Sequence, residues 1–255
     1  MDFEFEKFLR AGKNIFDNSS NQEKFKLLIL NSLATHLLEL ARSLGESQSF
    51  KYPNHDGPER NREELLTEAT QLLDSATQLD QYDVMTLASR ANVLIERNDY
   101  NAAEYFINYA INADPYYIPA LFGQAVIFNQ KGDIKEALKV YQTIFRIDSD
   151  ITNIRVYIAI CFHHLGMLKE ARAAIKRSLE INPQNVDALA LSSIMDMNQS
   201  KDQGLSSEEI NKFRSSSNQS LQAAFKLNPK NSTVALEMAR RFFEKGQYQK
   251  VLELH

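Results

Sequence analysis

Two histidines stand close to the single cysteine of the chain, at Cys161, His163 and His164, and these side-chain types bind zinc in proteins. Adjacent residues on a helix point about 100° apart, and no second histidine lies four residues away to complete a pair. One cysteine also cannot form an internal disulfide or a cysteine-based zinc site. The sequence therefore predicts no metal and no cofactor.

Carboxylates gather at Glu63, Glu64 and Glu68, where a pair could in principle act as general acid and base. All three fall within one expected helix, and a solvated helix face explains them better. Neither a Gly-x-Gly-x-x-Gly nor a Gly-x-x-x-x-Gly-Lys phosphate loop occurs, and only 8 of the 255 residues are glycine. We therefore predict that the chain is not an enzyme.

Charge and hydropathy limit the ligands further. The 29 basic and 33 acidic residues give a formal charge of -4, so no large positive field gathers phosphates, and we predict no direct binding of nucleic acid. The sequence has no apolar run of about 18 residues and no secretory signal at its start, which predicts no membrane partner. A single cysteine fits a reducing compartment, the cytosol or the nucleus.

Small residues recur every 34 residues through the middle of the chain, which is the length of a tetratricopeptide unit of two antiparallel helices. A small residue on each helix lets the two backbones approach closely. Apolar side chains at helical spacing then form a stripe that only a neighbouring hairpin can bury. The set on the first helices is Ala91, Ala125 and Ala159, and the set on the second helices is Ala103, Ala137 and Ala171.

Helix-ending residues follow the same register. Gly132 and Gly166 come after two of the first helices, and Asn98 takes the equivalent place one unit earlier. Glycine and asparagine are the residues that most readily adopt the left-handed conformation at a helix end. Pro115 and Pro183 recur after second helices, where proline stops a helix as the chain turns. These coincident registers predict an all-α fold, a right-handed superhelical solenoid of tetratricopeptide helical hairpins.

The register also divides the chain. One unit plus a 12-residue insertion separates Pro183 from Pro229, and the polar stretch 199–217 predicts a solvated loop or a short polar helix extension. Both predicted ends fall inside hairpins, so we expect a piece of a longer array that would melt higher if extended. The predicted elements are a tail helix of a preceding repeat at 1–12, a repeat at 24–83 with a long internal loop at 45–61, repeats at 84–117, 118–151 and 152–185, a repeat with the insertion at 186–231, and an incomplete repeat at 232–255.

The first helices of such an array line a surface that receives partner segments. Co-chaperone members of the class bind a C-terminal carboxylate there with basic and asparagine side chains, but here the equivalent positions are mainly apolar, so that clamp is absent. We expect a partner that buries apolar side chains, as an extended peptide or an amphipathic helix. The sequence equally allows Phe122, Val126 and Ile160 to pack against a neighbouring first helix. The predicted partner-binding residues are Asn92, Ile95, Phe122, Val126, Asn129, Val156, Tyr157, Ile160, His163 and Ile194.

Three stretches carry a closer resemblance: LLTEAT at 65–70 followed by 76–80, IPALFGQA at 118–125, and FFEKGQY at 242–248. Together with the insertion before Pro229, they resemble the N-terminal half of the tetratricopeptide scaffold subunit of the RNA polymerase II-associated factor complex, in a fungal form. The resemblance covers nearly the whole chain.

The resemblance implies a nuclear, non-catalytic scaffold for the other subunits of that complex, chiefly the subunit for which the complex is named. It implies an indirect link to elongating RNA polymerase II and to chromatin modification. Two alternatives stay open. One is an adaptor of the same fold in another assembly, such as a ubiquitin-ligase scaffold, and the other is the regulatory domain of an enzyme whose catalytic part lies outside these residues.

Overall fold

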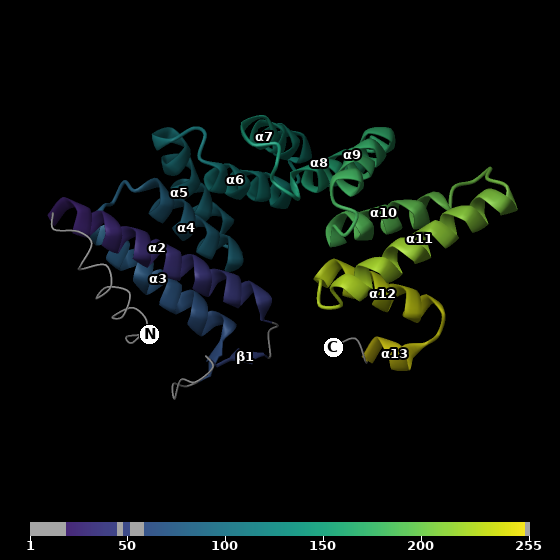
Figure 1. Cartoon of the computed structure of the whole chain (residues 1–255), viewed down its shortest axis with the longest axis horizontal. Coiled ribbons are helices and arrows are strands. Elements are labelled where there is room, and N and C mark those ends of the chain that lie inside the picture. The colour runs from purple at the N-terminus through teal and green to yellow at the C-terminus, as the bar shows by residue number, and fades with distance from the viewer. Residues whose placement is uncertain (1–18, 45–47, 52–58, 253–255) are drawn as a thin grey trace. The chain divides into compact units, whose positions relative to one another are not determined.

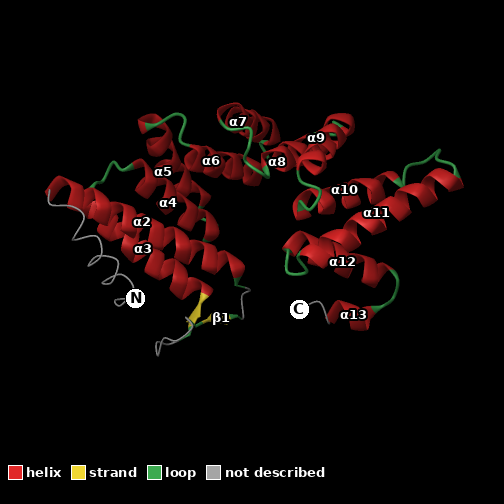
Figure 2. Ribbon diagram, in the orientation of Figure 1, coloured by secondary structure: helices red, strands yellow, loops and turns green. Residues whose placement is uncertain are grey.

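The computed structural model describes residues 19–44, 48–51 and 59–252, and these are almost entirely helical (Figures 1 and 2). The chain divides into two compact units, unit 1 at Met1–Lys131 and unit 2 at Gly132–His255. The predicted tail helix at 1–12 lies outside the described residues, as do 253–255 of the predicted incomplete repeat. The all-α prediction is confirmed, while the right-handed superhelical course of the whole chain and the repeat boundaries stay predictions.

Unit 1 is built from helices that pack in antiparallel pairs. The helix α2 (Ser19–Ser43) packs against α3 (Arg62–Leu79), and α4 (Val84–Glu96) packs against α5 (Tyr100–Ala113). The last helix, α6 (Ile118–Lys131), contacts both α4 and α5. The first of these helices begins before the predicted start of its repeat at residue 24.

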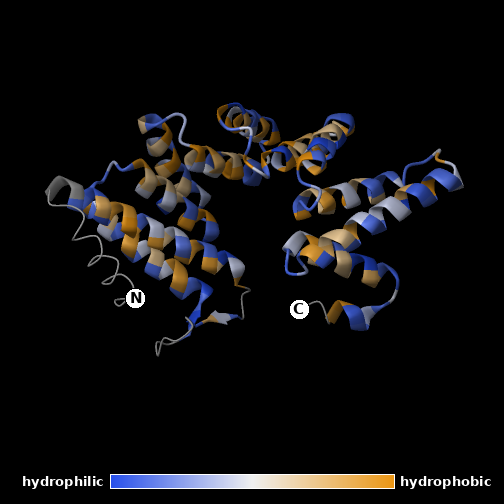
Figure 3. Ribbon diagram, in the orientation of Figure 1, coloured by the Kyte–Doolittle hydropathy of each residue, from blue (hydrophilic) through white to orange (hydrophobic). Residues whose placement is uncertain are grey.

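Small residues bring the helices of unit 1 together at the predicted positions. Ala91 of α4 and Ala103 of α5 are fully buried and share one apolar cluster with Ile107. Gly123 of α6 lies against the same cluster, because a Cβ atom there would stand 2.6 Å from Cδ1 of Ile107. Hydrophobic and hydrophilic residues are interspersed along each helix, as amphipathic helices require (Figure 3).

Unit 2 repeats the same hairpins. Its helices are α7 (Ile134–Ile147), α8 (Ile154–His164), α9 (Leu168–Ile181), α10 (Val186–Gln199), α11 (Ser207–Leu227), α12 (Ser232–Glu244) and α13 (Tyr248–Leu252). The helix α8 pairs with α9, and α10 pairs with α11 (Figure 1). Asn185, which caps α10, donates through Nδ2 to Oδ1 of Asn153 at 2.9 Å, and Asn231, which caps α12, donates to Oδ1 of Asp187 at 2.9 Å. Equivalent hydrogen bonds thus join successive first helices at two places, between corresponding positions of the repeat.

The turns after the first helices confirm the sequence prediction. Asn98 has a φ of 60°, Gly132 a φ of 82° and Gly166 a φ of 74°. All three lie in the left-handed region that asparagine and glycine enter most easily. Asparagine therefore does replace glycine at this turn of unit 1.

The 12-residue insertion forms both of the predicted alternatives. Residues 200–206 connect the two helices, and α11 then begins at Ser207 and runs for 21 residues, compared with 14 for α9. A capping box starts this helix, because Ser206 accepts from the backbone N–H of Glu209 while Glu209 accepts from that of Ser206. The whole stretch 207–217 is therefore helical.

A small strand pair interrupts the predicted loop at 45–61. Strands β1 (Ser49–Phe50) and β2 (Arg60–Asn61) pair in antiparallel fashion. A pairing of two residues leaves no alternating pattern in the sequence, which is why a plain loop is the expectation. Asn61 then caps α3 in a capping box with Glu64. Among the described helices, none is both long and apolar enough to cross a bilayer.

Candidate partner-binding surface

In unit 1, the predicted binding residues lie on two neighbouring first helices. They are Asn92 and Ile95 on α4, and Phe122, Val126 and Asn129 on α6, and all five side chains are partly exposed. Ile95 also packs against the core cluster that contains Ala91. Unit 1 therefore brings these residues onto adjacent helices at the boundary between core and surface.

In unit 2, the predicted residues divide between the core and the surface. Val156 is only 2% exposed and belongs to the core cluster, against which Ile160 also packs. Tyr157 is 37% exposed and stacks on Tyr141, with ring centroids 5.3 Å apart. Val156 is thus a core residue, and Ile160 takes the core side of the alternative that the sequence allows, because the cluster contains side chains of α9 and α10.

The remaining predicted residues of unit 2 are partly exposed. His163 lies at the end of α8, and Ile194 lies on α10, which contacts α8. Burial, helped by the neighbouring His164, lowers the pKa of His163. The imidazole is therefore held toward its neutral form.

The cysteine beside these histidines is chemically quiet. Burial raises the pKa of the Cys161 thiol to about 11, so the thiol stays protonated at neutral pH. A thiolate is the form that attacks or binds metal, and Cys161 is not in that form. Within the described ranges, no group of three histidine, cysteine or acidic side chains gathers as a metal site would need.

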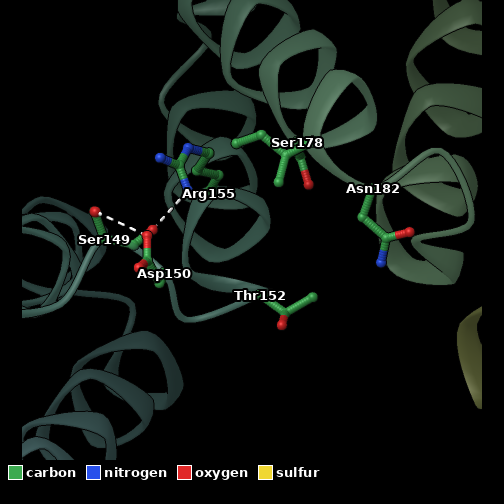
Figure 4. Close-up of a pocket in the computed structure, with 7 residues that line it drawn as sticks. Ser149, Asp150, Thr152, Arg155, Ser178 and Asn182 are labelled. Carbon is green, nitrogen blue, oxygen red and sulfur yellow. Dashed lines mark hydrogen bonds between the residues drawn. The ribbon is translucent and has the colours of Figure 1, made fainter.

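A polar pocket of about 290 Å³ lies where α8 begins and α9 ends (Figure 4). Arg155 donates through Nη1 to the backbone oxygen of Ser149 at 2.8 Å, and its guanidinium covers the ring of Phe145. Ser178 and Asn182 face it from across the pocket (Figure 4). The pocket can hydrogen-bond a small polar group, but it sets no nucleophile beside a base.

The sequence prediction missed a larger groove between a second helix and the first helix that follows it. It encloses about 480 Å³ between α9 and α10. Its lining residues are Arg172, Ile175, Lys176, Leu179, Glu180, Ser192 and Met195. The signal was present in the repeat register, where Ser192 takes a place that an arginine, Arg90, takes three units earlier. The predicted partner-binding positions on the first helices do not include this one.

Known proteins share the repeat and are similar in sequence. A tetratricopeptide-repeat family model matches residues 128–193. The protein named CTR9 homolog from Arabidopsis thaliana is 25% identical over 230 residues, which cover 90% of this chain and 19% of that protein. RNA polymerase-associated protein CTR9 from Caenorhabditis elegans is 33% identical over 134 residues, which cover 50% of this chain and 12% of that protein. The chain thus spans less than a fifth of the length of either relative.

Solved structures show the same fold. A tetratricopeptide repeat protein from Parabacteroides merdae has a TM-score of 0.54 at 13% identity, over 88% of this chain and 77% of that one. A human IFIT1 dimer with PPP-AAAA has a TM-score of 0.57 at 17% identity, over 74% of this chain and 45% of that one. The predicted tetratricopeptide architecture is confirmed, and the fungal origin stays a prediction. The sequence is similar to proteins named CTR9, and residues 128–193 match the tetratricopeptide-repeat family.

Proposed function

We propose that this chain is part of a non-catalytic scaffold in a transcription elongation complex associated with RNA polymerase II. The observation that carries the proposal is the similarity to two CTR9 proteins, one of which is named for its association with RNA polymerase. Stacked hairpins suit a scaffold, because each repeat adds surface without needing a catalytic centre. The scaffold acts in the nucleus, contacts the polymerase only indirectly, and binds neither nucleic acid nor membrane.

The proposed partner is an extended or helical segment of the subunit for which the complex is named. It lies along the first helices, where the partly exposed side chains of α4 and α6 in unit 1 and Tyr157 of α8 in unit 2 support the proposal. Apolar and aromatic side chains at such a boundary stay partly exposed in the free protein. They gain contacts when a partner segment covers them.

Pairwise co-purification with each subunit of the complex tests this proposal. We expect Phe122→Glu, on the first helix α6, to weaken capture of the partner subunit by at least about tenfold, because a carboxylate would face apolar side chains. The matched control is Tyr109→Glu, which places the same charge on the exposed face of the second helix α5. Circular dichroism must show unchanged helicity in both variants.

Two results would contradict the proposal. Capture of chaperones instead of elongation-complex subunits would contradict the proposed membership of the elongation complex. Equal loss of capture in the α5 variant would contradict a binding surface on the first helices, since both substitutions add the same carboxylate but on different helices.

A further inference from the structure

Each unit contains a groove between a second helix and the first helix that follows it, and in unit 1 the next second helix, α5, adds Phe106. In unit 1 its lining residues are Thr70, Leu73, Arg90, Val93, Leu94, Arg97 and Phe106. Three steps of the 34-residue repeat relate it to the groove of unit 2, so that Thr70 corresponds to Arg172, Leu73 to Ile175, Arg90 to Ser192 and Val93 to Met195. We call these the unit 1 groove and the unit 2 groove. They enclose about 90 Å³ and about 480 Å³.

An arginine from the chain itself fills the unit 1 groove. Arg90 of α4 donates through Nη2 to Oδ1 of Asp74 at 2.6 Å and through Nη1 to Oγ1 of Thr77 at 2.7 Å. Its guanidinium also lies 5.4 Å from the ring centroid of Phe106 on α5. An aliphatic stem, a charge pair and an aromatic wall thus occupy the space between α3 and α5.

The unit 2 groove lacks each of these groups. Ser192 replaces Arg90, and Lys176 replaces Asp74, which reverses the charge on the rim. With the 12-residue insertion counted, Ser220 of α11 replaces Phe106. The stem, the carboxylate and the aromatic wall that close the unit 1 groove are therefore missing at these positions, and the guanidinium of Arg172 instead lies 5.8 Å from the ring centroid of Phe213.

An apolar floor and a cationic rim remain. Ile175 and Met195 of the floor belong to the core cluster, and Leu179 packs against it. On the rim, Arg172 donates to Asp196 at 2.7 Å, and Glu180 is paired with Arg177 at 3.0 Å. Lys176, by contrast, has no ion pair within the described part of the chain.

The groove is therefore complementary to a ligand with an apolar group for the floor and a negative charge for the rim. We propose that the unit 2 groove is a docking site for an acidic amphipathic protein segment. Such a segment places an aliphatic side chain against Ile175 and Met195, and a carboxylate on the ammonium group of Lys176. It reproduces the Arg90–Asp74 arrangement with the two charges exchanged between groove wall and occupant. The site lies between the second helix α9 and the first helix α10, and none of its lining residues is among the predicted partner-binding residues of the first helices.

A pair of synthetic peptides tests the proposal on the whole chain. The probe is a fluorescein-labelled peptide of about 12 residues, with leucine at every third or fourth position and glutamate between. Its control peptide carries lysine in place of each glutamate. We expect fluorescence anisotropy to show binding of the acidic peptide and at least about tenfold weaker binding of the basic one.

Variants that exchange the two grooves locate the binding. The double substitution Ser192→Arg with Lys176→Asp copies the closed arrangement of unit 1, and we expect it to weaken the acidic peptide at least about tenfold. The reciprocal pair, Arg90→Ser with Asp74→Lys, opens the unit 1 groove and should raise the number of bound peptides. Lys226→Glu, an exposed charge change on α11 away from the groove, should leave binding unchanged.

If Ser192→Arg with Lys176→Asp left binding of the acidic peptide unchanged, the proposal would be overturned, because the peptide would then occupy another surface. Equal binding of the two peptides, or no binding of either, would overturn it as well. Circular dichroism of each variant separates a closed groove from an unfolded chain.

Discussion

The two grooves lie at equivalent positions of the repeat but have different side chains. In unit 1, Arg90 and Asp74 come from neighbouring helices and satisfy each other, so the groove serves stability. In unit 2, Ser192 and Lys176 stand at those places and leave the space open. The repeat therefore specifies where a groove can form, and a few residues decide whether the chain or a ligand fills it.

The same register extends to the residue at the floor of each groove. This floor position is Val93 in α4 and Met195 in α10, and with the insertion counted it is Arg241 in α12. All three side chains are buried. The floor thus changes from aliphatic to charged along the chain, although the fold around it does not change.

The largest expected effect comes from the charged floor. Arg241 is 5% exposed and donates through Nη2 to Oγ of Ser193 at 2.6 Å and of Ser217 at 2.8 Å, beside the carboxylate of Glu237. We expect Arg241→Ala to lower the free energy of unfolding by about 3 kcal/mol, because it leaves buried oxygens without their donor. Urea unfolding followed by circular dichroism measures the loss.

The matched control for this prediction is Arg214→Ala, which removes an exposed arginine of α11. It should change the free energy of unfolding by less than about 0.5 kcal/mol. Similar losses for the two variants would show that the buried hydrogen bonds of Arg241 contribute little.

Truncating one floor residue in each groove distinguishes the closed unit 1 groove from the open unit 2 groove. Leu73 is 1% exposed beneath Arg90 and Phe106, whereas Ile175 is 4% exposed in the open groove. We expect Leu73→Ala to cost about 3 kcal/mol and Ile175→Ala about 2 kcal/mol, because only the first leaves an enclosed cavity. Urea unfolding of both variants checks the order, and the reverse order would mean that the unit 2 groove is closed in solution.

Exchange of the filling group itself has a smaller effect. Arg90→Ser removes an ion pair, a hydrogen bond and a ring contact, and should cost about 1.5 kcal/mol. Ser192→Arg with Lys176→Asp forms the equivalent pair at a half-exposed rim and should gain no more than about 0.5 kcal/mol. Melting temperatures of the two variants should therefore move in opposite directions, and a shift in the same direction would refute the equivalence of the two grooves.

The turns after the first helices provide a comparison of still smaller size. Gly166→Ala forces a Cβ into a left-handed turn of unit 2 and should cost about 1 kcal/mol. Asn98→Gly, at the same turn of unit 1, should gain a few tenths of a kcal/mol at most, since asparagine already tolerates that conformation. Thermal unfolding measures both, and a large loss at Asn98 would show that its side chain matters more than its φ.

Periodic features of the fold could be predicted from the sequence, because they recur at a fixed spacing. The small residues at Ala91 and Ala103, and the left-handed turn at Asn98, each depend on a property that one residue carries by itself. Strand β1 and the helical extension of α11 depend instead on short local contacts, which a repeat register does not report.

The candidate surfaces were less predictable for a related reason. Whether Val156 faces core or ligand depends on how α8 meets both neighbours, and helical spacing alone gives the same answer for both. The unit 2 groove depends on two helices at once, and Ser192 has meaning only beside Lys176 of α9. Comparing repeats position by position would have found it.

The smallest effect concerns the floor position of α8, which is Cys161. Burial raises the pKa of this thiol from 9.0 to about 11, so the unfolded chain loses the proton at a lower pH than the folded one. Its contribution to stability is therefore constant below about pH 8 and is lost as pH rises through 9 toward 11. Between about pH 7.5 and about pH 9.5 the loss should be below about 1 kcal/mol. Cys161→Ala removes the thiol, so the difference between its urea midpoint and that of the unmodified chain should shrink over this interval, while the other titrating groups cancel. If the difference between the two urea midpoints stayed constant with pH, solvent would reach Cys161. The floor position of α8 would then be less closed than the floor positions of α4 and α10.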